Sequence, residues 1–387
     1  MNPLLGMPSI EVLLADQCAR QQGIELGAAL QTKIAAAEQS LQEFETFRLQ
    51  QPWWMPFSVF QYMAQWRART MLEPQIAMAF PRMQERIAGM AEGARTSVEF
   101  LYLFHAMESA STSAAMQQPA VAACTALAAT GHRTADQRPL LAHNFDLVAS
   151  ASPLLTLREN RSHGGLRFLA MSLAPLAGVI DGVNEAGLAI TYNYAPTTDI
   201  LDGGPPISMS IDRALEKCHT VKQAIELLSA APRGGGALLM LADAQGDIAA
   251  LELSAHHTAR RQPQSDCVLS HSNAYQSTTM QTHEMPRTAV YGLDAPEALR
   301  GVTIFQSAEQ RDARLSELVR EYDLISLETL DHIMSDHGCS GEPSANTVCM
   351  HGAHWSTLAS VQLIPAERRI RVSYGTTCQA EFHDFQL

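Results

Sequence analysis

The sequence predicts an α+β protein in which a helical N-terminal part precedes a longer part rich in short strands. Before about residue 108, apolar residues recur at helical spacing. After residue 124, short β-type segments are separated by Gly, Asp and Asn and are grouped around a few helical segments. This grouping is typical of α+β layers rather than of alternating βαβ units.

The first part, residues 1–108, has the pattern of amphipathic helices. One helix carries an apolar stripe opposite Glu38, Gln42 and Glu43. The simplest interpretation is a stripe that faces the core, and a partner-binding helix is the alternative. This stripe on the first helix consists of Leu30, Ile34, Ala37, Leu41 and Phe44. A second helix is expected over Ser97–Met107.

Residues 108–123 are expected to form an exposed or mobile connector. They are small and polar and have no periodic apolar face. Pro119 disfavours continuation of the preceding helix.

The second part is expected to contain strands, then helices, then a closing hairpin. Capping boxes predict helix starts at Thr220 with Gln223 and at Ser307 with Gln310. The turn "DAQGD" is expected to join two strands. The expected strands are 124–130, 139–147, 166–174, 187–195, the pair within 236–254 and the hairpin 357–375, and the expected helices are 220–231, 307–322 and 326–337.

Composition excludes several classes of function. The net charge of -13 argues against sequence-independent nucleic-acid binding, which needs a basic face. No window is long and apolar enough to span a membrane, and the N-terminus lacks the features of a signal peptide. The seven cysteines are scattered and odd in number, which suits a reducing cytosol. We therefore expect a cytoplasmic protein without nucleic-acid or membrane partners.

Cys124 is the residue with the most informative context. A free cysteine is most often a small, inert, buried residue, and Cys18, Cys218 and Cys267 are interpreted in that way. Cys124 instead begins a strand directly after the connector. If the bond between Ala123 and Cys124 were cut, the thiol would lie beside a free α-amine, so one residue would hold a nucleophile and a neutral-pH base. Small residues before the bond would allow it to adopt a strained turn.

Five motifs in order resemble the acyl-CoA:6-aminopenicillanic acid acyltransferase family of N-terminal nucleophile hydrolases, which is related to the choloylglycine hydrolases. The resemblance covers most of 124–387. The motifs are "ACTALAATGHRTADQRPLLAHNFDL", "GVIDGVNEAGLAITYNYAP", "VLSHSNAY", "SAEQRDARL" and the closing hairpin "TLASVQLIPAERRIRVSYGTTCQAEFHDFQL". The resemblance implies a four-layer αββα sandwich for 124–387, a helical pro-part for 1–123, and self-cleavage before Cys124. The residue before the family's cysteine is usually Gly, and here it is Ala123.

The same resemblance implies roles for four further residues. Asp146 matches the active-site Asp, and Asn273 matches a catalytic Asn whose side-chain N–H holds the oxyanion. Arg311 matches the Arg at a helix start, and Asp146 is its natural ion partner. Arg314 is the fallback candidate for the role of Arg311. Asn193 matches the oxyanion Asn of the choloylglycine branch, and its simpler interpretation is a strand-end turn residue.

A Cys- and His-containing loop offers an alternative chemistry. The segment 335–355 contains His337, Cys339, Cys349, His351 and His354, which could form a zinc site. The spacing lacks a CxxC pair, and relatives with a similar Asp-His and Cys-x-His loop need no metal. We therefore expect no metal and no cofactor.

The resemblance implies a self-processing enzyme that hydrolyses or transfers an acyl group at a linear amide of a small acylated amine or amino-acid conjugate. Water as acceptor would give an amidohydrolase, and a second amine or acyl-CoA as partner would give an acyltransferase. After cleavage the two fragments would remain as an α/β heterodimer, and a homo-oligomer is left open. The alternative is an unprocessed, non-catalytic binding or scaffold protein of the same fold, which Ala123 favours.

Overall fold

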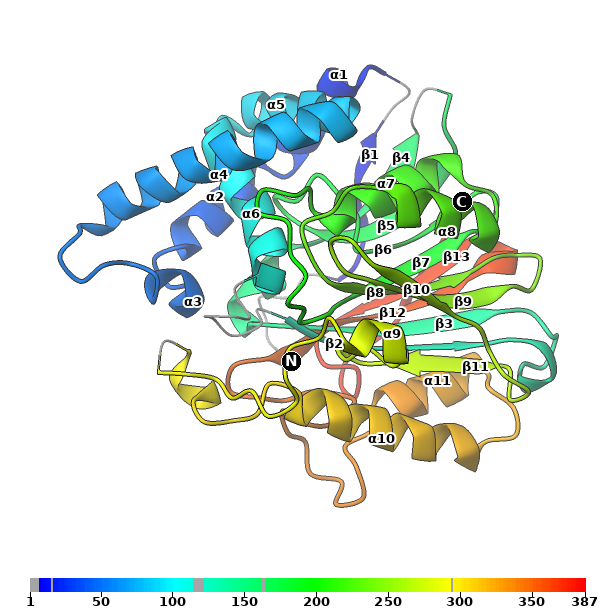
Figure 1. The fold of residues 1–387 in the computed structure, drawn as a ribbon. Coiled ribbons are helices and arrows are strands. Elements are labelled where there is room, and N and C mark those ends of the chain that lie inside the picture. The colour runs from blue at the N-terminus through cyan, green and yellow to red at the C-terminus, as the bar shows by residue number, and fades with distance from the viewer. Residues whose placement is uncertain (1–6, 15–16, 114–121, 162–163, 294) are drawn as a thin grey trace.

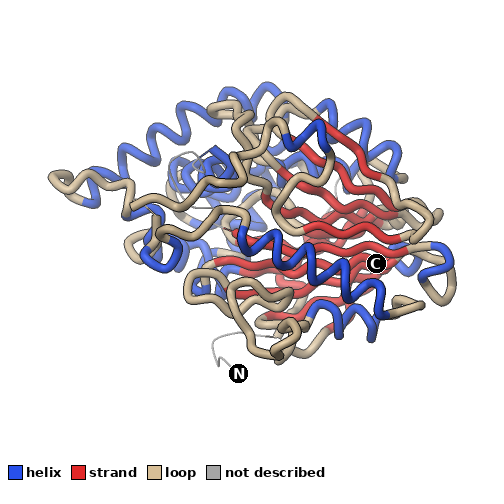
Figure 2. Tube along the Cα trace, turned by 60° about the horizontal axis from the view of Figure 1, so that its bottom comes forward, coloured by secondary structure: helices blue, strands red, loops and turns tan. Residues whose placement is uncertain are grey.

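The computed structural model describes residues 7–14, 17–113, 122–161, 164–293 and 295–387. Two β-sheets lie face to face, and helices cover the outer face of each sheet (Figures 1 and 2). This is the four-layer αββα arrangement that the family resemblance predicts. None of the helices in these ranges combines the length and the apolarity needed to cross a bilayer.

The larger sheet has eight strands in the order β1-β4-β5-β6-β7-β8-β9-β10. The pairing of β1 with β4 is parallel, and the other described pairs of this sheet are antiparallel. Strands β8 and β9 are buried at every position, which fits their nearly continuous apolar sequences. The strands are β1 (Ile10–Leu14), β4 (Leu155–Arg161), β5 (Arg167–Leu173), β6 (Asp181–Asn184), β7 (Ala189–Tyr194), β8 (Ala237–Ala242), β9 (Ile248–Leu253) and β10 (Thr258–Arg261).

The smaller sheet has six strands, all antiparallel, in the order β11-β2-β3-β12-β13-β14. Its central strands β2 and β3 carry the first family motif. The β12–β13 hairpin turns at Pro365–Glu367, as the sequence predicts. The strands are β2 (Ala122–Ala129), β3 (Leu140–Leu147), β11 (Val268–His271), β12 (Ser356–Ile364), β13 (Arg369–Tyr374) and β14 (His383–Gln386).

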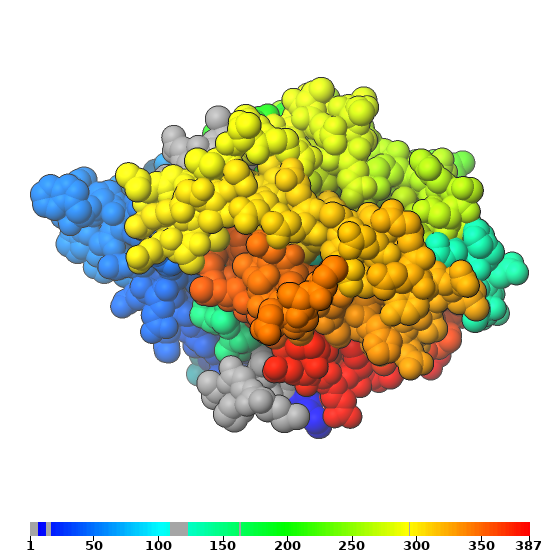
Figure 3. All heavy atoms as spheres, turned by 90° about the horizontal axis from the view of Figure 1, so that it is seen from below, coloured from blue at the N-terminus to red at the C-terminus, as the bar shows by residue number. Residues whose placement is uncertain are grey.

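Two helix pairs form the outer layers. Helices α7 (Ile207–Lys217) and α8 (Val221–Ala230) pack on the larger sheet, and α10 (Gln306–Glu321) and α11 (Leu327–Met334) pack on the smaller one (Figure 1). Viewed from the side of α10, the C-terminal third of the chain forms most of the surface (Figure 3). The short helix α9 spans Thr278–Gln281.

The N-terminal part is helical, but it also contributes a strand to the larger sheet. Strand β1 pairs in parallel with β4, so the prediction of an entirely helical first part was wrong at this point. The helices project from one end of the sandwich (Figures 1 and 3). They are α1 (Ala19–Ala29), α2 (Gln31–Ser40), α3 (Glu45–Arg48), α4 (Phe57–Ala79), α5 (Pro81–Ala94) and α6 (Val98–Ser113).

A buried ion pair joins this N-terminal part to the sandwich. Arg86 of α5 donates to Asp212 of α7 at 2.9 Å, and both side chains are almost completely buried. Arg158 of β4 lies 3.5 Å from the same carboxylate. Since an unpaired buried charge is very unfavourable, these contacts link the two parts strongly.

The glycines of α1 and α5 allow the two helices to approach closely. A Cβ atom on Gly27 would lie 2.2 Å from the Met90 carbonyl oxygen, and one on Gly93 would lie 2.0 Å from that of Ile24. Both distances are shorter than any real contact, so this part of the helix interface requires glycine.

Two predicted boundaries change in the structure. Helix α6 continues to Ser113, so the first six residues of the expected connector are helical, and 114–121 lie outside the described residues. The Thr220 cap is confirmed, because its hydroxyl accepts a hydrogen bond from the Gln223 backbone N–H. The Ser307 capping box is wrong, because α10 begins at Gln306 and the Ser307 hydroxyl instead contacts Arg311 and the Ala345 carbonyl.

Candidate functional site

Cys124 lies inside β2, in the middle layer of the sandwich. Strand β2 begins at Ala122, and Ala123 and Cys124 lie opposite Asp146 and Phe145 of β3. Both residues of the predicted cleavage site are buried. The bond between them therefore lies within a paired strand, which corrects the expectation of a strained turn.

The backbone of Cys124 is held by two side chains from distant parts of the chain. Its N–H donates to Asn273 Oδ1 at 2.9 Å, and its carbonyl oxygen accepts a hydrogen bond from Arg311 Nη1. Arg311 Nη2 also donates to Asn273 Oδ1, at 2.8 Å. Asn273 and Arg311, two residues proposed from sequence motifs, thus meet at the predicted nucleophile.

Arg311 is buried, and its partners differ from the predicted one. Besides Cys124 and Asn273, it donates to Thr125 Oγ1 at 2.8 Å and to Ser307 Oγ at 3.2 Å. Asp146 is hydrogen-bonded to Thr357 and affects Arg311 through its charge, and the described residues show no direct ion pair between Asp146 and Arg311, contrary to the prediction. The fallback residue, Arg314, forms an ion pair with Asp336 at 2.8 Å.

Asp146 lies next to the predicted cleavage site in the strand register. Thr357 Oγ1 of β12 donates to its Oδ1 at 2.6 Å, and its Oδ2 has no hydrogen-bond partner within the described ranges. Burial raises the pKa of Asp146 to about 7, although the charges of Arg311 and His143 and the Thr357 hydroxyl act in the opposite direction.

The two predicted asparagines connect the larger sheet to the end of β11. Asn273 Nδ2 donates to the Tyr194 carbonyl oxygen at 2.8 Å, and Asn193 Nδ2 donates to the Ser272 carbonyl oxygen at 2.9 Å. The Asn273 N–H expected to hold an oxyanion is therefore used by Tyr194 in the intact chain. Asn193 contacts the neighbour of Asn273 and positions it indirectly.

The strand pleat separates the side chains of the site into two groups. Residues that lie opposite each other in an antiparallel pair point to the same face, and successive residues point to opposite faces. The Cys124 thiol therefore shares a face with Phe145 and His143, whereas Asp146 shares the other face with Ala123 and Thr125. The predicted carboxylate does not face the thiol.

His143 and Asp181 form a buried pair beside Cys124 that the sequence analysis did not identify. His143 Nδ1 and Asp181 Oδ2 are 2.8 Å apart, and both side chains are fully buried. Burial lowers the pKa of His143, but the Asp181 carboxylate and the Cys124 sulfur outweigh burial and raise it to about 10. His143 Nε2 makes no ordinary hydrogen bond within the described residues. The Cys124 sulfur is thus close enough to affect the pKa of His143 without forming an ordinary hydrogen bond with it.

A sequence signal for His143 existed, whereas none existed for Asp181. His143 is two residues before Phe145 on the strand next to Cys124, so the period of two puts it on the face of the thiol. Asp181 comes from β6 of the other sheet, and only the stacking of the two sheets brings it to His143.

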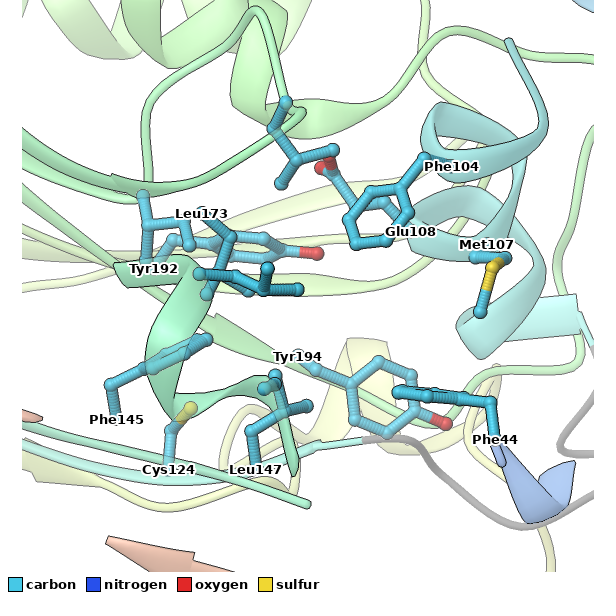
Figure 4. A pocket seen from close by; sticks show the side chains of 14 residues that line it. Phe44, Phe104, Met107, Glu108, Cys124, Phe145, Leu147, Leu173, Tyr192 and Tyr194 are labelled. Carbon is cyan, nitrogen blue, oxygen red and sulfur yellow. The ribbon is translucent and has the colours of Figure 1, made fainter. Parts of the chain in front are cut away.

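The Cys124 sulfur points into an apolar cavity between the sheets and the N-terminal helices (Figure 4). The cavity has a volume of about 100 Å³. Phe44, Phe104 and Met107 of the N-terminal part form the wall farthest from Cys124 (Figure 4). The lining residues are Phe44, Phe104, Met107, Glu108, Cys124, Phe145, Leu147, Ala151, Leu154, Leu173, Leu176, Ile180, Tyr192 and Tyr194.

Glu108 is the carboxylate of this cavity. Its oxygens accept hydrogen bonds from the Ser208 N–H at 2.9 Å and the Ser208 hydroxyl at 2.6 Å. Burial raises the pKa of Glu108 to about 7, against the effect of these hydrogen bonds. The cavity can therefore accommodate an apolar group, with a titratable carboxyl on one side.

Comparison with models of protein families identifies the family of this chain. The model of the family described as acyl-coenzyme A:6-aminopenicillanic acid acyl-transferase matches residues 133–375. The chain belongs to this family, as its motifs predict. A search of curated proteins finds no match.

Solved structures with a similar chain course include proteins from three organisms. An N-acylethanolamine-hydrolyzing acid amidase ortholog from Caenorhabditis elegans has 12% identity and a TM-score of 0.42, over 63% of this chain and 93% of that one. Penicillin V acylase from Agrobacterium tumefaciens has 14% identity and a TM-score of 0.42, over 68% and 86%. A conjugated bile acid hydrolase variant from Clostridium perfringens has 14% identity and a TM-score of 0.38, over 68% and 97%.

Proposed function

We propose that this protein is a self-processing amidohydrolase or acyltransferase in which Cys124 is the N-terminal nucleophile of the mature enzyme. The observation that carries the proposal is the position of Cys124. Its sulfur lies at an apolar cavity, and its backbone nitrogen is hydrogen-bonded to Asn273. Cleavage of the Ala123–Cys124 bond would convert that nitrogen into an α-amine that is already held beside the thiol.

The first step is self-cleavage. The Cys124 thiolate attacks the Ala123 carbonyl carbon, the bond from that carbon to the Cys124 nitrogen breaks, and the nitrogen takes up a proton. Water then hydrolyses the resulting thioester, which releases the carboxylate of Ala123 and leaves a free thiol and a free amine on Cys124. These two reaction steps need no reactant other than the chain itself and water.

His143 would assist Cys124 in the intact chain, before the α-amine is formed. Before cleavage the Cys124 nitrogen is an amide and cannot act as a base. The charged His143, held by Asp181, would place a positive charge on the face of the attacking Cys124 sulfur before the α-amine exists. Two observations support this role: His143 and Asp181 are both buried, and His143 lies on the same face of the sheet as the Cys124 sulfur.

In the mature enzyme, the α-amine of Cys124 would transfer the proton during attack on a substrate amide. Asn273 would exchange its contact with Tyr194 for the oxyanion, and Arg311 would fix Cys124 and Asn273 through its fork of donors. Asp146 would act from the opposite face, through its charge and its place opposite Ala123. Asn193 would position the segment that carries Asn273.

The cavity favours an apolar acyl chain as the substrate group bound beside Cys124. Its lining is almost entirely aliphatic and aromatic. Glu108 could receive a cationic or hydroxylated group of the substrate at the cavity wall. The substrate class is therefore a linear amide between an apolar acyl group and a small amine or amino acid.

The two fragments would stay together after cleavage. The N-terminal part supplies β1 to the larger sheet, the buried Arg86 that contacts Asp212, and one wall of the cavity. Separation would expose these apolar and charged groups. The mature protein is therefore proposed to be a heterodimer of the fragments 1–123 and 124–387.

One observation favours the alternative of an unprocessed binding protein. Ala123 and Cys124 are buried and paired in β2 in the intact chain. A binding protein of this kind would keep its chain whole and would form no covalent acyl adduct.

The proposed activity can be tested with a chromogenic series of acyl anilides that differ in chain length. The account predicts release of the aniline and, during turnover, an acyl adduct on the peptide that begins with Cys124. Cys124→Ala should abolish both signals, and Cys218→Ala, which changes another buried cysteine, should retain them. An adduct on another residue, or hydrolysis by Cys124→Ala, would contradict the proposal.

A further inference from the structure

Four potential metal ligands meet at the end of the smaller sheet, away from the apolar cavity. They are His337 after α11, Cys349 and His351 in the loop before β12, and Cys378 in the turn after β13. One ligand atom from each residue lies within 4.8 Å of every other. The sequence segments around residue 340 and the C-terminus lie side by side on this face (Figure 3).

The distances within the cluster fit a tetrahedral zinc site. The His351 Nε2 atom is 3.5 Å from Cys349 Sγ and 3.3 Å from Cys378 Sγ. Zinc–sulfur and zinc–nitrogen bonds of the usual length give a tetrahedral edge of about 3.6 Å between sulfur and nitrogen. The observed separations are therefore close to those that a shared ion would impose.

His337 supplies a second, independent observation. Its Nε2 atom is buried and has no hydrogen-bond partner within the described ranges. Its ring lies 5.1 Å from that of His351, centroid to centroid, at an angle of 80°. A buried ring nitrogen without a partner is unfavourable, and a metal ion between the two histidines would remove this cost.

We propose that His337, Cys349, His351 and Cys378 bind a structural zinc ion. Two thiolates and two imidazoles are the donors that zinc prefers, whereas magnesium and calcium prefer oxygen. Four protein ligands leave no open coordination position for water or substrate, so the ion would have a structural role.

The surroundings of the cluster explain what the ion would stabilise. Asn144 of β3 donates to the carbonyl oxygens of Met334 and Val348 and accepts a hydrogen bond from Thr377. These are neighbours of the proposed ligands, so the outer contacts connect the loop and the turn to the central strand.

The ion would also connect this region to the predicted cleavage site. Met350, between two proposed ligands, donates its N–H to Thr357 Oγ1, and the same hydroxyl donates to Asp146. Met350 also packs in the small cluster that contains Ala123. The zinc site would therefore hold one side of the region around Ala123 and Asp146 in place.

This proposal reverses the expectation of no metal. Of the five Cys and His residues in the loop 335–355, the structure brings together His337, Cys349 and His351. Cys339 is exposed and contacts Arg314, and His354 packs against Trp355. The fourth proposed ligand, Cys378, lies in the turn after β13, so the two cysteine ligands do not form a CxxC motif that could be recognised in the sequence.

The test is the metal content of the full-length protein, purified under reducing conditions from zinc-supplemented medium. The proposal predicts one zinc per chain and, after exchange with cobalt, a sulfur-to-cobalt charge-transfer absorption. Cys378→Ser should weaken zinc binding by more than about 100-fold, because loss of outer partners alone weakens metal sites by about 10- to 100-fold. His351→Gln should have a similar effect.

Matched controls come from the same loop. Cys339→Ser and His354→Gln replace residues outside the cluster and should retain one zinc per chain. A wild-type chain that remains free of zinc after reconstitution, or a Cys378→Ser variant that keeps its zinc, would overturn the proposal. So would a disulfide between Cys349 and Cys378 in the reduced preparation. These readouts do not depend on self-cleavage or on amidase activity.

Discussion

The side-chain oxygen of Asn273 accepts a hydrogen bond from the backbone nitrogen of Cys124 at 2.9 Å, across 149 positions of the sequence. The same oxygen accepts a second hydrogen bond from Arg311 at 2.8 Å. One amide oxygen thus connects the strand of the proposed nucleophile to helix α10. The nitrogen that would become the α-amine is therefore positioned before any bond is cut.

Replacement of Asn273 tests this contact. Asn273→Ala removes the acceptor of the Cys124 N–H and the proposed oxyanion donor, so we expect self-cleavage to slow by about 100-fold or more. Asn193→Ala should slow it less, because Asn193 acts only through the Ser272 carbonyl. Time courses by intact mass measure both rates. Equal rates for Asn193→Ala and Asn273→Ala would contradict the assigned roles.

Arg311→Lys keeps the charge but removes the fork of donors. A lysine cannot reach Cys124, Thr125, Asn273 and Ser307 together, and the buried acceptors would lose partners. We expect a loss of about 2–4 kcal/mol in the free energy of unfolding, with slower self-cleavage. Arg314→Lys, on the same helix with an ion pair to Asp336, is the matched control and should change stability by less than about 1 kcal/mol. Denaturant titration gives both values, and similar losses would argue against a special role for Arg311.

Asp181→Asn tests the proposed effect of His143 on the thiol. Without the carboxylate, burial should lower the pKa of His143, and the imidazole should be neutral at pH 7. The proposed positive charge beside the Cys124 sulfur is then lost, and alkylation of Cys124 in the intact chain should slow by about tenfold or more at pH 7. Alkylation of Cys218, followed by peptide mapping of the same samples, should be unchanged. An unchanged rate at Cys124 would eliminate His143 as a modulator of the thiol.

Asp146→Asn gives a stability change with a defined dependence on pH. Burial raises the pKa of Asp146 to about 7 in the folded state, whereas it is about 3.9 in the unfolded chain. The folded state therefore holds the proton more tightly, and the wild-type protein loses stability from this group as pH rises from about 4 to 7. The Asn variant lacks that loss and should become the more stable protein across this window, by on the order of 4 kcal/mol above pH 7. Urea unfolding at pH 4.5 and 8 measures the difference, and a variant that becomes relatively less stable at pH 8 would show that Asp146 is held as a stabilising anion.

Local patterns were sufficient to predict much of the fold. The nearly continuous burial of β3, the continuous apolar runs of β8 and β9, and the Thr220 cap are all determined by neighbouring residues. Strand β1 was missed because its pairing with β4 depends on a contact between residues more than a hundred positions apart. Ser307 was misassigned because its hydroxyl serves the buried Arg311 instead of the helix start.

Only the site residues that belong to the family motifs could be predicted from the sequence. Cys124, Asn273 and Arg311 meet as the motif order implies, but the pairing of Arg311 with Asp146 could not be tested without strand register. The register places Asp146 on the face away from the thiol. Asp181 and Cys378 reach their partners through sheet stacking and a distant turn, and no spacing in the sequence encodes either contact.

The central claim is that the chain cuts itself before Cys124. The most direct measurement is intact-mass analysis of freshly purified protein combined with N-terminal sequencing. The account predicts two fragments of 123 and 264 residues (387 minus 123), with the larger one beginning Cys-Thr-Ala-Leu, and a whole chain for Cys124→Ala. A wild-type protein that remains a single 387-residue chain while it hydrolyses amides, or a second N-terminus at any other residue in active material, would contradict it.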